Sequence, residues 1–171
     1  DSLADMVSFG VVPGTVMFML LQRADDSFLG MPMQTFAFFG FLITVFSGLR
    51  LAKFNIDTRQ TTSFIGLPTP ANTIFVSSLP LILQNGDLMH FAIILNPWVL
   101  VILTVLLSYL LVAELPLFAL KFKNLSWKDN SVRFTFLILS AILVALLNFA
   151  AIPLIIVLYI LLSIIKRTSN T

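Results

Sequence analysis

The chain of 171 residues contains no cysteine, and only 11% of its residues are charged, whereas 58% are hydrophobic. The lack of cysteine excludes a disulfide framework and thiol chemistry. A soluble domain has about 25% charged residues, so this chain has too few to cover a surface that faces water. Its mean hydropathy of +1.02 and its long, continuous apolar runs predict an all-α, polytopic helical membrane protein.

Several functional motifs are also missing from the sequence. It has no glycine-rich phosphate loop, no nucleophile elbow and no basic, aromatic patch of the kind that binds nucleic acid. We therefore expect no nucleic-acid partner. Residue 1 is not a methionine and no signal peptide precedes the first apolar run, so we expect the chain to begin inside a larger protein.

Six apolar segments predict about six transmembrane helices in a single membrane domain that occupies residues 1–171. In the first segment, Gly10 and Gly14 form a small-xxx-small pair that predicts a close helix–helix contact, with a kink near Pro13. The third segment is short and contains Pro80, so we expect it to be irregular or tightly packed. Residues 148–151 predict a tight hairpin between the last two helices. The approximate bounds of the six segments are 1–22, 35–51, 70–83, 91–113, 134–147 and 152–165.

Basic residues alternate between the predicted loops. The second and fourth loops and the C-terminal tail contain lysine and arginine, the third and fifth contain neither, and Arg23 in the first is the exception. Because loops rich in lysine and arginine stay in the cytoplasm, the second and fourth loops and the C-terminus are predicted to be cytoplasmic. The first helix then runs outward, with Asp1 and Asp5 at its cytoplasmic end. Trp98 and Trp127 are expected to anchor the chain at the two interfaces.

The sequence opens with Asp1-Ser-Leu-Ala-Asp5, and no further charge follows before Arg23. Positions i and i+4 of a helix share a face, with Cβ atoms roughly 6 Å apart. At an effective dielectric of about 20, two carboxylates at that distance repel by roughly 3 kcal/mol. The pair therefore indicates a bound cation or one carboxyl group that is kept neutral. The alternative is that two acids merely favour a helix N-terminus through its dipole.

The second predicted loop begins with a basic cluster. Arg50 and Lys53 are three residues apart, so they share a face at the end of the second segment. The positive-inside rule alone accounts for these charges. The alternative is a site for an anionic substrate that they share with Asp1 and Asp5.

The same loop ends in the unusual segment Phe64-Ile-Gly-Leu-Pro-Thr-Pro-Ala-Asn72. Pro68 and Pro70 predict an extended path, and Gly66 permits the close approach of another backbone. Topology gives no reason for such a segment at the point where the chain re-enters the bilayer. A role in a binding site is the hypothesis that would account for this segment.

These motifs resemble those of a known family. Asp-Ser-Leu-Ala-Asp followed by Met-Val-Ser-Phe-Gly is similar to the second half of the signature of the CDP-alcohol phosphatidyltransferases. Arg-Leu-Ala-Lys-Phe-Asn, which begins at Arg50, and the segment that begins at Phe64 resemble the phosphatidylserine synthase branch of that family. The likeness extends over essentially the whole chain, because the later segments match in number and orientation.

The resemblance implies an enzyme that transfers the phosphatidyl group of CDP-diacylglycerol to the hydroxyl of L-serine and releases CMP. It implies that Asp1 and Asp5 belong to a site for Mg²⁺ or Mn²⁺, and that Asp5 is the general base for the acceptor hydroxyl. Hard cations prefer carboxylate oxygens, and a base beside a metal can activate an alcohol. It further implies a homodimer in the lipid bilayer of the cell (inner) membrane, with its active site on the cytoplasmic face.

The acceptor site implied by the resemblance comprises six residues of the second loop and its edge. The three polar ones are expected to bind the serine carboxylate or a lipid phosphate, and the other three to shape the wall of the site. These residues are Arg50, Lys53, Asn55, Phe64, Gly66 and Pro68.

One part of the family pattern is absent from the sequence. The first half of the signature, Asp-xx-Asp-Gly-xx-Ala-Arg, does not occur, and neither does the helix that precedes it. We expect both upstream in the full-length protein, together with about two more transmembrane helices. The chain then carries half of the metal site and is not expected to be active in isolation.

Two other functions stay open at the level of the sequence. A sister phosphatidyltransferase would use another alcohol, such as glycerol phosphate or inositol phosphate, and would need more clustered arginine than the second loop has. A small transporter or channel subunit would use Asp1 and Asp5 as an ion site. Transporters place charge near the bilayer midplane on broken helices, and none of the predicted segments has a charge at its centre.

Overall fold

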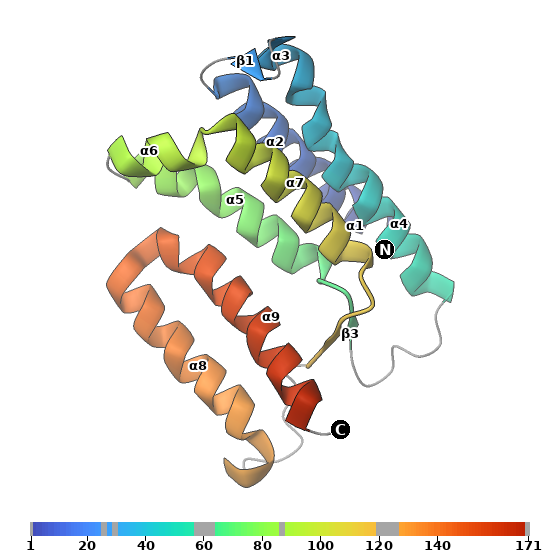
Figure 1. The fold of residues 1–171 in the computed structure, drawn as a ribbon. Helices are drawn as coiled ribbons and strands as arrows, with labels where there is room; N and C mark the ends of the chain where they lie inside the picture. The colour runs from blue at the N-terminus through green and yellow to red at the C-terminus, as the bar shows by residue number, and fades with distance from the viewer. Residues whose placement is uncertain are drawn as a thin grey trace.

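The computed structural model describes residues 2–24, 27–28, 31–56, 64–85, 88–118 and 127–169, and its architecture is all-α (Figure 1). The first helical rod runs without a break through α1 (Ser2–Met6), the π-helical turn η1 (Val7–Val11) and α2 (Val12–Arg23). The second rod runs back antiparallel to the first. It consists of α3 (Met33–Phe36), the 3-10 turn η2 (Ala37–Phe41) and α4 (Leu42–Ile56).

Five further helical elements complete the described part of the fold, together with two very short antiparallel strand pairs. The helices are α5 (Thr69–Asn85), α6 (Leu88–Ile94), α7 (Pro97–Val112), α8 (Trp127–Leu147) and α9 (Ala151–Ser169). The 3-10 turn η3 (Asn148–Ala150) joins the last two. The strand pairs are β1 (Ser27–Phe28) with β2 (Met31–Pro32), and β3 (Phe64–Ile65) with β4 (Pro116–Leu117).

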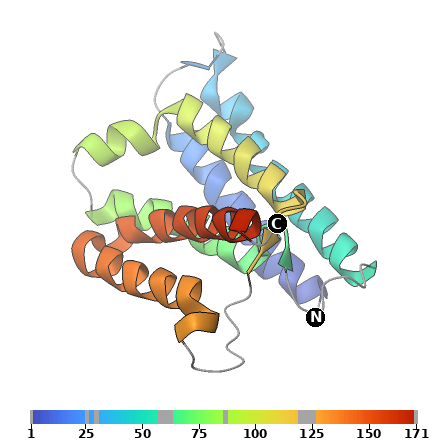
Figure 2. The same cartoon turned by 60° about the horizontal axis from the view of Figure 1, so that its bottom comes forward.

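The lengths and compositions of the helices support the prediction of a membrane protein. Three helical stretches are long and apolar enough to cross a bilayer, namely Ser2–Arg23, Gln34–Ile56 and Asn130–Ile165. The last of these contains two arms, because the chain turns back at Asn148, where φ is +48°. The arms α8 and α9 pack antiparallel, so the predicted hairpin at residues 148–151 is confirmed (Figures 1 and 2).

The predicted single helix over residues 91–113 is wrong, because this segment is two helices. α6 ends at Ile94, and Asn96 then begins α7 by accepting hydrogen bonds at its side-chain oxygen from the backbone N–H groups of Trp98 (2.9 Å) and Val99 (3.4 Å). Asparagine is a preferred N-cap, and Pro97 disfavours helical geometry at the residue before it. The break therefore follows from local chemistry that an apolar run does not reveal.

The predicted extended path through Pro70 is also wrong, because α5 already begins at Thr69. A proline is tolerated in the first turn of a helix, where its missing N–H has no helical partner. Pro80 lies inside α5 without ending it. The helix is tightly packed, as one of the two expected alternatives proposed: Phe75, Val76 and Leu79 are among its many buried residues.

Glycines hold the first two rods together, which confirms the predicted close contact at Gly10 and Gly14. A Cβ at Gly14 would overlap the Thr44 hydroxyl, and one at Gly40 would lie 2.6 Å from the backbone nitrogen of Phe18. The Thr44 hydroxyl donates a 2.9 Å hydrogen bond to the Gly10 carbonyl. Small residues thus allow the backbones to approach as closely as helices in membranes commonly do.

The α8–α9 hairpin is attached to the rest of the fold through an aromatic cluster. The Tyr159 hydroxyl donates a 2.8 Å hydrogen bond to the Phe118 carbonyl, just beyond β4. The Tyr159 ring lies 5.0 Å from that of Phe118 and 5.8 Å from that of Phe136. α9 also packs against α5, so the hairpin rests on one side of the bundle (Figure 1).

Candidate active site

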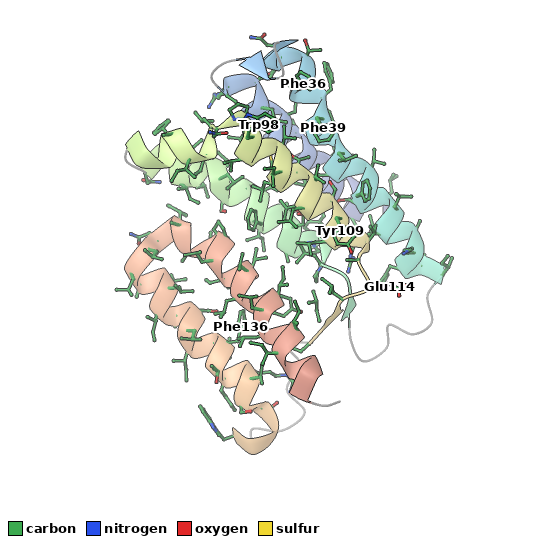
Figure 3. The ribbon with its side chains drawn as sticks, viewed as in Figure 1. Phe36, Phe39, Trp98, Tyr109, Glu114 and Phe136 are labelled. Carbon is green, nitrogen blue, oxygen red and sulfur yellow. The ribbon has the colours of Figure 1, made fainter. Side chains whose placement is uncertain are left out.

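The predicted site residues that the structure describes come together at one end of the bundle, here called the site end. It is the end at which α1 and α5 begin and α4 and α7 finish (Figure 1). Figure 3 labels Glu114 at this end of α7 and Trp98 at the opposite end of the same helix. Glu114 is exposed there, as expected of a solvated helix end.

Asp5 and Arg50 lie at the same level of two antiparallel helices. The Asn55 amide donates to the Ser2 hydroxyl at 3.1 Å, and that hydroxyl donates back to the amide oxygen at 3.4 Å. At the next level the Ser47 hydroxyl bonds the Phe9 carbonyl. Asp5 falls between Ser2 and Phe9 on one helix, as Arg50 falls between Ser47 and Asn55 on the other.

The Phe9 carbonyl joins three helices at this end. In an α-helix it would accept a hydrogen bond from the residue four positions later, but Pro13 has no N–H. Instead it accepts from the Ser47 hydroxyl of α4 and from the Thr73 hydroxyl of α5, both at 3.3 Å. The Thr73 hydroxyl also lies 2.9 Å from the Thr69 carbonyl, so its single proton is shared between the two carbonyls. The expected kink near Pro13 is thus a π-helical turn, a feature that frequently occurs at functional sites.

On the site-end side of this shared carbonyl, two side chains have buried polar atoms without a protein partner. Arg50 is 8% exposed, and its Nε has no hydrogen-bond partner. Asn72, in the first turn of α5, is 0% exposed, and neither its Oδ1 nor its Nδ2 has a partner. A buried polar group left unpaired costs about 1–3 kcal/mol, so two such residues together point to a place where a polar ligand binds.

Asn72 was not among the predicted site residues. The motif that ends in it was interpreted through its glycine and its prolines, and nothing in the sequence marks the asparagine as buried. One signal was present. A single asparagine in the first turn of a largely apolar helix either caps that helix or faces a polar site, and Thr69 already begins α5 three residues earlier.

Lys53 and Asn55 lie on the last turns of α4, and both are exposed. Both polar atoms of the Asn55 side chain bond Ser2, so this residue ties the end of α4 to the start of α1. Lys53 is free to reach solvent or a lipid headgroup at the same end. The structure therefore places these two residues at the rim and Arg50 inside.

Gly66 and Pro68 hold the start of α5 against the end of α7. Gly66 has φ of +76°, and a Cβ there would meet the carbonyl oxygens of Leu111 at 2.8 Å and Ala113 at 3.0 Å. The N–H of Leu67 donates to the Leu110 carbonyl at 2.9 Å, which satisfies one of the free carbonyls of the helix end. The Pro68 carbonyl accepts from the N–H of Asn72 at 3.0 Å. The backbone of Phe64 lies in β3, opposite Leu117.

Asp5 is half-buried at the first turn of the bundle, and Asp1 lies outside the described residues. Among the residues that the structure describes, no group of three or more His, Cys, Asp or Glu side chains could hold a metal. The carboxylate of Asp5 has the donor chemistry that Mg²⁺ and Mn²⁺ prefer. It fits one ligand of the predicted metal site, and Asp1 is predicted to be another.

Three curated proteins are similar to this chain, and all are called CDP-diacylglycerol–serine O-phosphatidyltransferase. The Bacillus subtilis protein is 32% identical over 119 residues, which are 67% of this chain and 54% of that protein. Proteins from two Helicobacter pylori strains are 37% and 36% identical over 78 residues, 44% of this chain and 30% of each relative. These relatives match the family that the motifs of this chain resemble, the CDP-alcohol phosphatidyltransferases. The similarity of the chain is to the phosphatidylserine synthase branch, as the motifs predicted.

The comparison rests on these relatives, because no family model and no solved structure matches the chain. The chain spans between about a third and a half of the length of the relatives that it matches.

Proposed function

We propose that this chain is part of a membrane enzyme that transfers the phosphatidyl group of CDP-diacylglycerol to the hydroxyl of L-serine, with phosphatidylserine and CMP as products. The observation that supports it best is the site end itself. There Asp5 and the buried, unpartnered Arg50 lie at the same level of two helices that meet at the Phe9 carbonyl. A carboxylate and a guanidinium are what a hydroxyl and a carboxylate on one small acceptor require.

In the proposed reaction, Asp5 takes the proton from the serine hydroxyl while the serine oxygen attacks the phosphorus that carries the diacylglycerol. A new P–O bond forms to serine, the bond between the two phosphates breaks, and its electron pair leaves with CMP. Arg50 binds the serine carboxylate, since a buried guanidinium makes strong bonds to that group. A divalent cation held with Asp1 and Asp5 would neutralise the diphosphate and stabilise the leaving group.

The remaining predicted residues take supporting roles in this proposal. Lys53, exposed at the rim, attracts an anionic headgroup, and Asn55 keeps the end of α4 on the start of α1. Gly66 and Pro68 fix the start of α5, and thereby the positions of the polar residues in its first turn. These roles concern the shape of the wall more than direct contact with the acceptor.

The decisive experiment is CMP release by the full-length protein in mixed micelles of detergent and CDP-diacylglycerol, with one candidate alcohol at a time. We expect CMP with L-serine and little with glycerol 3-phosphate or inositol phosphate. CMP release that needs one of the phosphorylated alcohols would replace this proposal with the sister enzyme. Ion flux in proteoliposomes that is independent of CDP-diacylglycerol would favour the transporter.

We further propose that the site end faces the cytoplasm, in keeping with the basic loops at this end and with water-soluble serine and CMP. Because the chain has no cysteine, single cysteines can be labelled without a background. Ile56→Cys lies at the site end, where residue 56 is 82% exposed, and Gln34→Cys lies at an exposed position at the other end of the same rod. In intact cells an impermeant maleimide should label only Gln34→Cys, and the reverse pattern would invert the topology.

The homodimer is the last part of the proposal, and it rests on the family resemblance. Light scattering on the purified full-length protein in detergent, corrected for bound detergent, should give twice the mass of the polypeptide. A mass equal to one polypeptide at concentrations that support full activity would contradict it.

A further inference from the structure

Asn72 is a buried polar residue to which the proposed chemistry has so far given no role. Its side chain is 0% exposed in the first turn of α5, and both its oxygen and its nitrogen are without a hydrogen-bond partner. An amide carries one kind of atom that accepts and another that donates. The ligand that satisfies both must therefore present a donor and an acceptor within the reach of one side chain.

The position of Asn72 in the first turn of α5 places it at the same end of the bundle as the proposed acceptor. The next residue, Thr73, bonds the Phe9 carbonyl, which Ser47 also bonds. Side chains of a helix tilt toward its N-terminus, so Asn72 leans from this shared carbonyl toward the site end. Asp5 and Arg50 lie one turn from the same carbonyl in the same direction.

We propose that Asn72 recognises the amino-acid part of the acceptor: its Oδ1 accepts a hydrogen bond from the ammonium group, and its Nδ2 donates to the carboxylate that Arg50 also binds. This inference rests on the proposed function. A guanidinium alone attracts any anion, whereas the unpaired amide oxygen repels one and requires a donor. Asn72 thus selects a zwitterion over a phosphorylated alcohol, because the ammonium group offers charged donors that a phosphate dianion lacks.

The test compares two acceptors for the full-length protein, by CMP release from CDP-diacylglycerol. L-serine has the ammonium group, and 3-hydroxypropionate has the same hydroxyl and carboxylate without it. Asn72→Leu should raise the KM for serine about 10- to 100-fold, because hydrogen bonds to charged groups are lost. It should lower the preference for serine over 3-hydroxypropionate, measured as the ratio of their kcat/KM values, by at least about 10-fold. The KM for CDP-diacylglycerol should stay within about twofold.

Asn85→Leu is the matched control, because Asn85 is an exposed asparagine at the other end of the same helix. It should leave the KM for serine and the acceptor preference unchanged. A serine KM within twofold of the wild-type value in Asn72→Leu would overturn the inference. So would an equal loss toward both acceptors, which is the mark of a purely structural asparagine.

A second variant decides the case if Asn72→Leu does not fold, as judged by its melting temperature in detergent. Asn72→Asp keeps an acceptor and loses the amide donor, so it should preserve the preference for the amine and raise the KM for serine. A lost preference with Asn72→Asp would overturn the inference. Failure of the proposed function is distinguishable, because the wild-type protein would then release no CMP with serine at all.

Discussion

The bundle of α1 to α7 and the α8–α9 hairpin differ in how much of their apolar length is buried. In the most apolar stretches of the Ser2–Arg23 and Gln34–Ile56 helices, 28% and 33% of residues are buried, whereas the figure for the hairpin is 11%. The bundle also holds Arg50, Asn72 and the shared Phe9 carbonyl, while the hairpin is attached through α9 and one aromatic cluster. Close packing and buried polar side chains therefore occur in the same part of the fold. Close contacts between backbones position the site in the bundle, and the hairpin has mostly exposed apolar side chains.

The largest expected effect is the loss of turnover when Asp5, the acidic residue at the site end of the bundle, is replaced. Asp5→Asn should lower kcat by about 10²- to 10⁴-fold, the usual contribution of a general base, while the fold is kept. CMP release by the full-length protein measures the loss. Glu114→Gln removes an exposed acid at the same end and should leave kcat within about twofold. Substantial turnover by Asp5→Asn would show that Asp5 is not the general base. The bundle would then lose the catalytic role that distinguishes it from the hairpin.

The next effect concerns the close backbones of the bundle. Gly40→Ala places a Cβ 2.6 Å from the nitrogen of Phe18, and overpacking of this kind costs about 1–3 kcal/mol. Thermal unfolding in detergent should show a clearly lowered Tm. The control is Ala145→Leu, which enlarges an exposed residue of the hairpin and should leave Tm unchanged. Equal shifts in the two variants would mean that the hairpin is packed as closely as the bundle.

A smaller and non-additive effect is expected at the Phe9 carbonyl. Ser47→Ala or Thr73→Val alone leaves one hydroxyl bonded to it. Ser47→Ala should cost about 0.6 kcal/mol, the average for such bonds in membranes, and Thr73→Val somewhat more, because it also removes the bond to the Thr69 carbonyl. The double variant leaves the carbonyl without either hydroxyl and should cost more than the sum of the two. A double-mutant cycle on unfolding free energies measures the difference, and simple additivity would show that the two hydroxyls act independently.

The smallest effect is expected in the hairpin. Tyr159→Phe removes the hydrogen bond to the Phe118 carbonyl and keeps the ring between its aromatic neighbours. It should cost about 1 kcal/mol of unfolding free energy and leave kcat and the serine KM unchanged. A change in the serine KM would show that the hairpin, and not the bundle alone, contributes to the site.

Much of the architecture follows from the sequence. The apolar runs correctly predicted most of the helical segments. Gly10 and Gly14 predicted the close contact between the first two rods, and residues 148–151 predicted the hairpin between the last two helices. These features depend on composition and spacing, which can be read locally. The break between α6 and α7 was missed, because hydropathy does not register that Asn96 can cap a helix.

The site was predictable only in part, for a different physical reason. Arg50 and Asp5 stand out because charges are rare in apolar segments, and the structure places them at one level. Asn72 carries no charge, and its burial depends on helices that are distant in sequence. Gly66 permits the close approach of another backbone, as predicted, but the sequence does not reveal that this backbone is the end of α7. Roles that arise from tertiary packing cannot be predicted from a short sequence motif.

The missing hydrogen of Pro13 has a consequence for how the protein moves. Because one carbonyl oxygen is shared by hydroxyls from α4 and α5, a shift of either helix by one residue, about 1.5 Å, would break a bond. We therefore expect η1, α4 and α5 to move as one rigid body. Any relative movement within the described part of the fold is then expected between this body and the α8–α9 hairpin, in which the smallest share of the apolar length is buried.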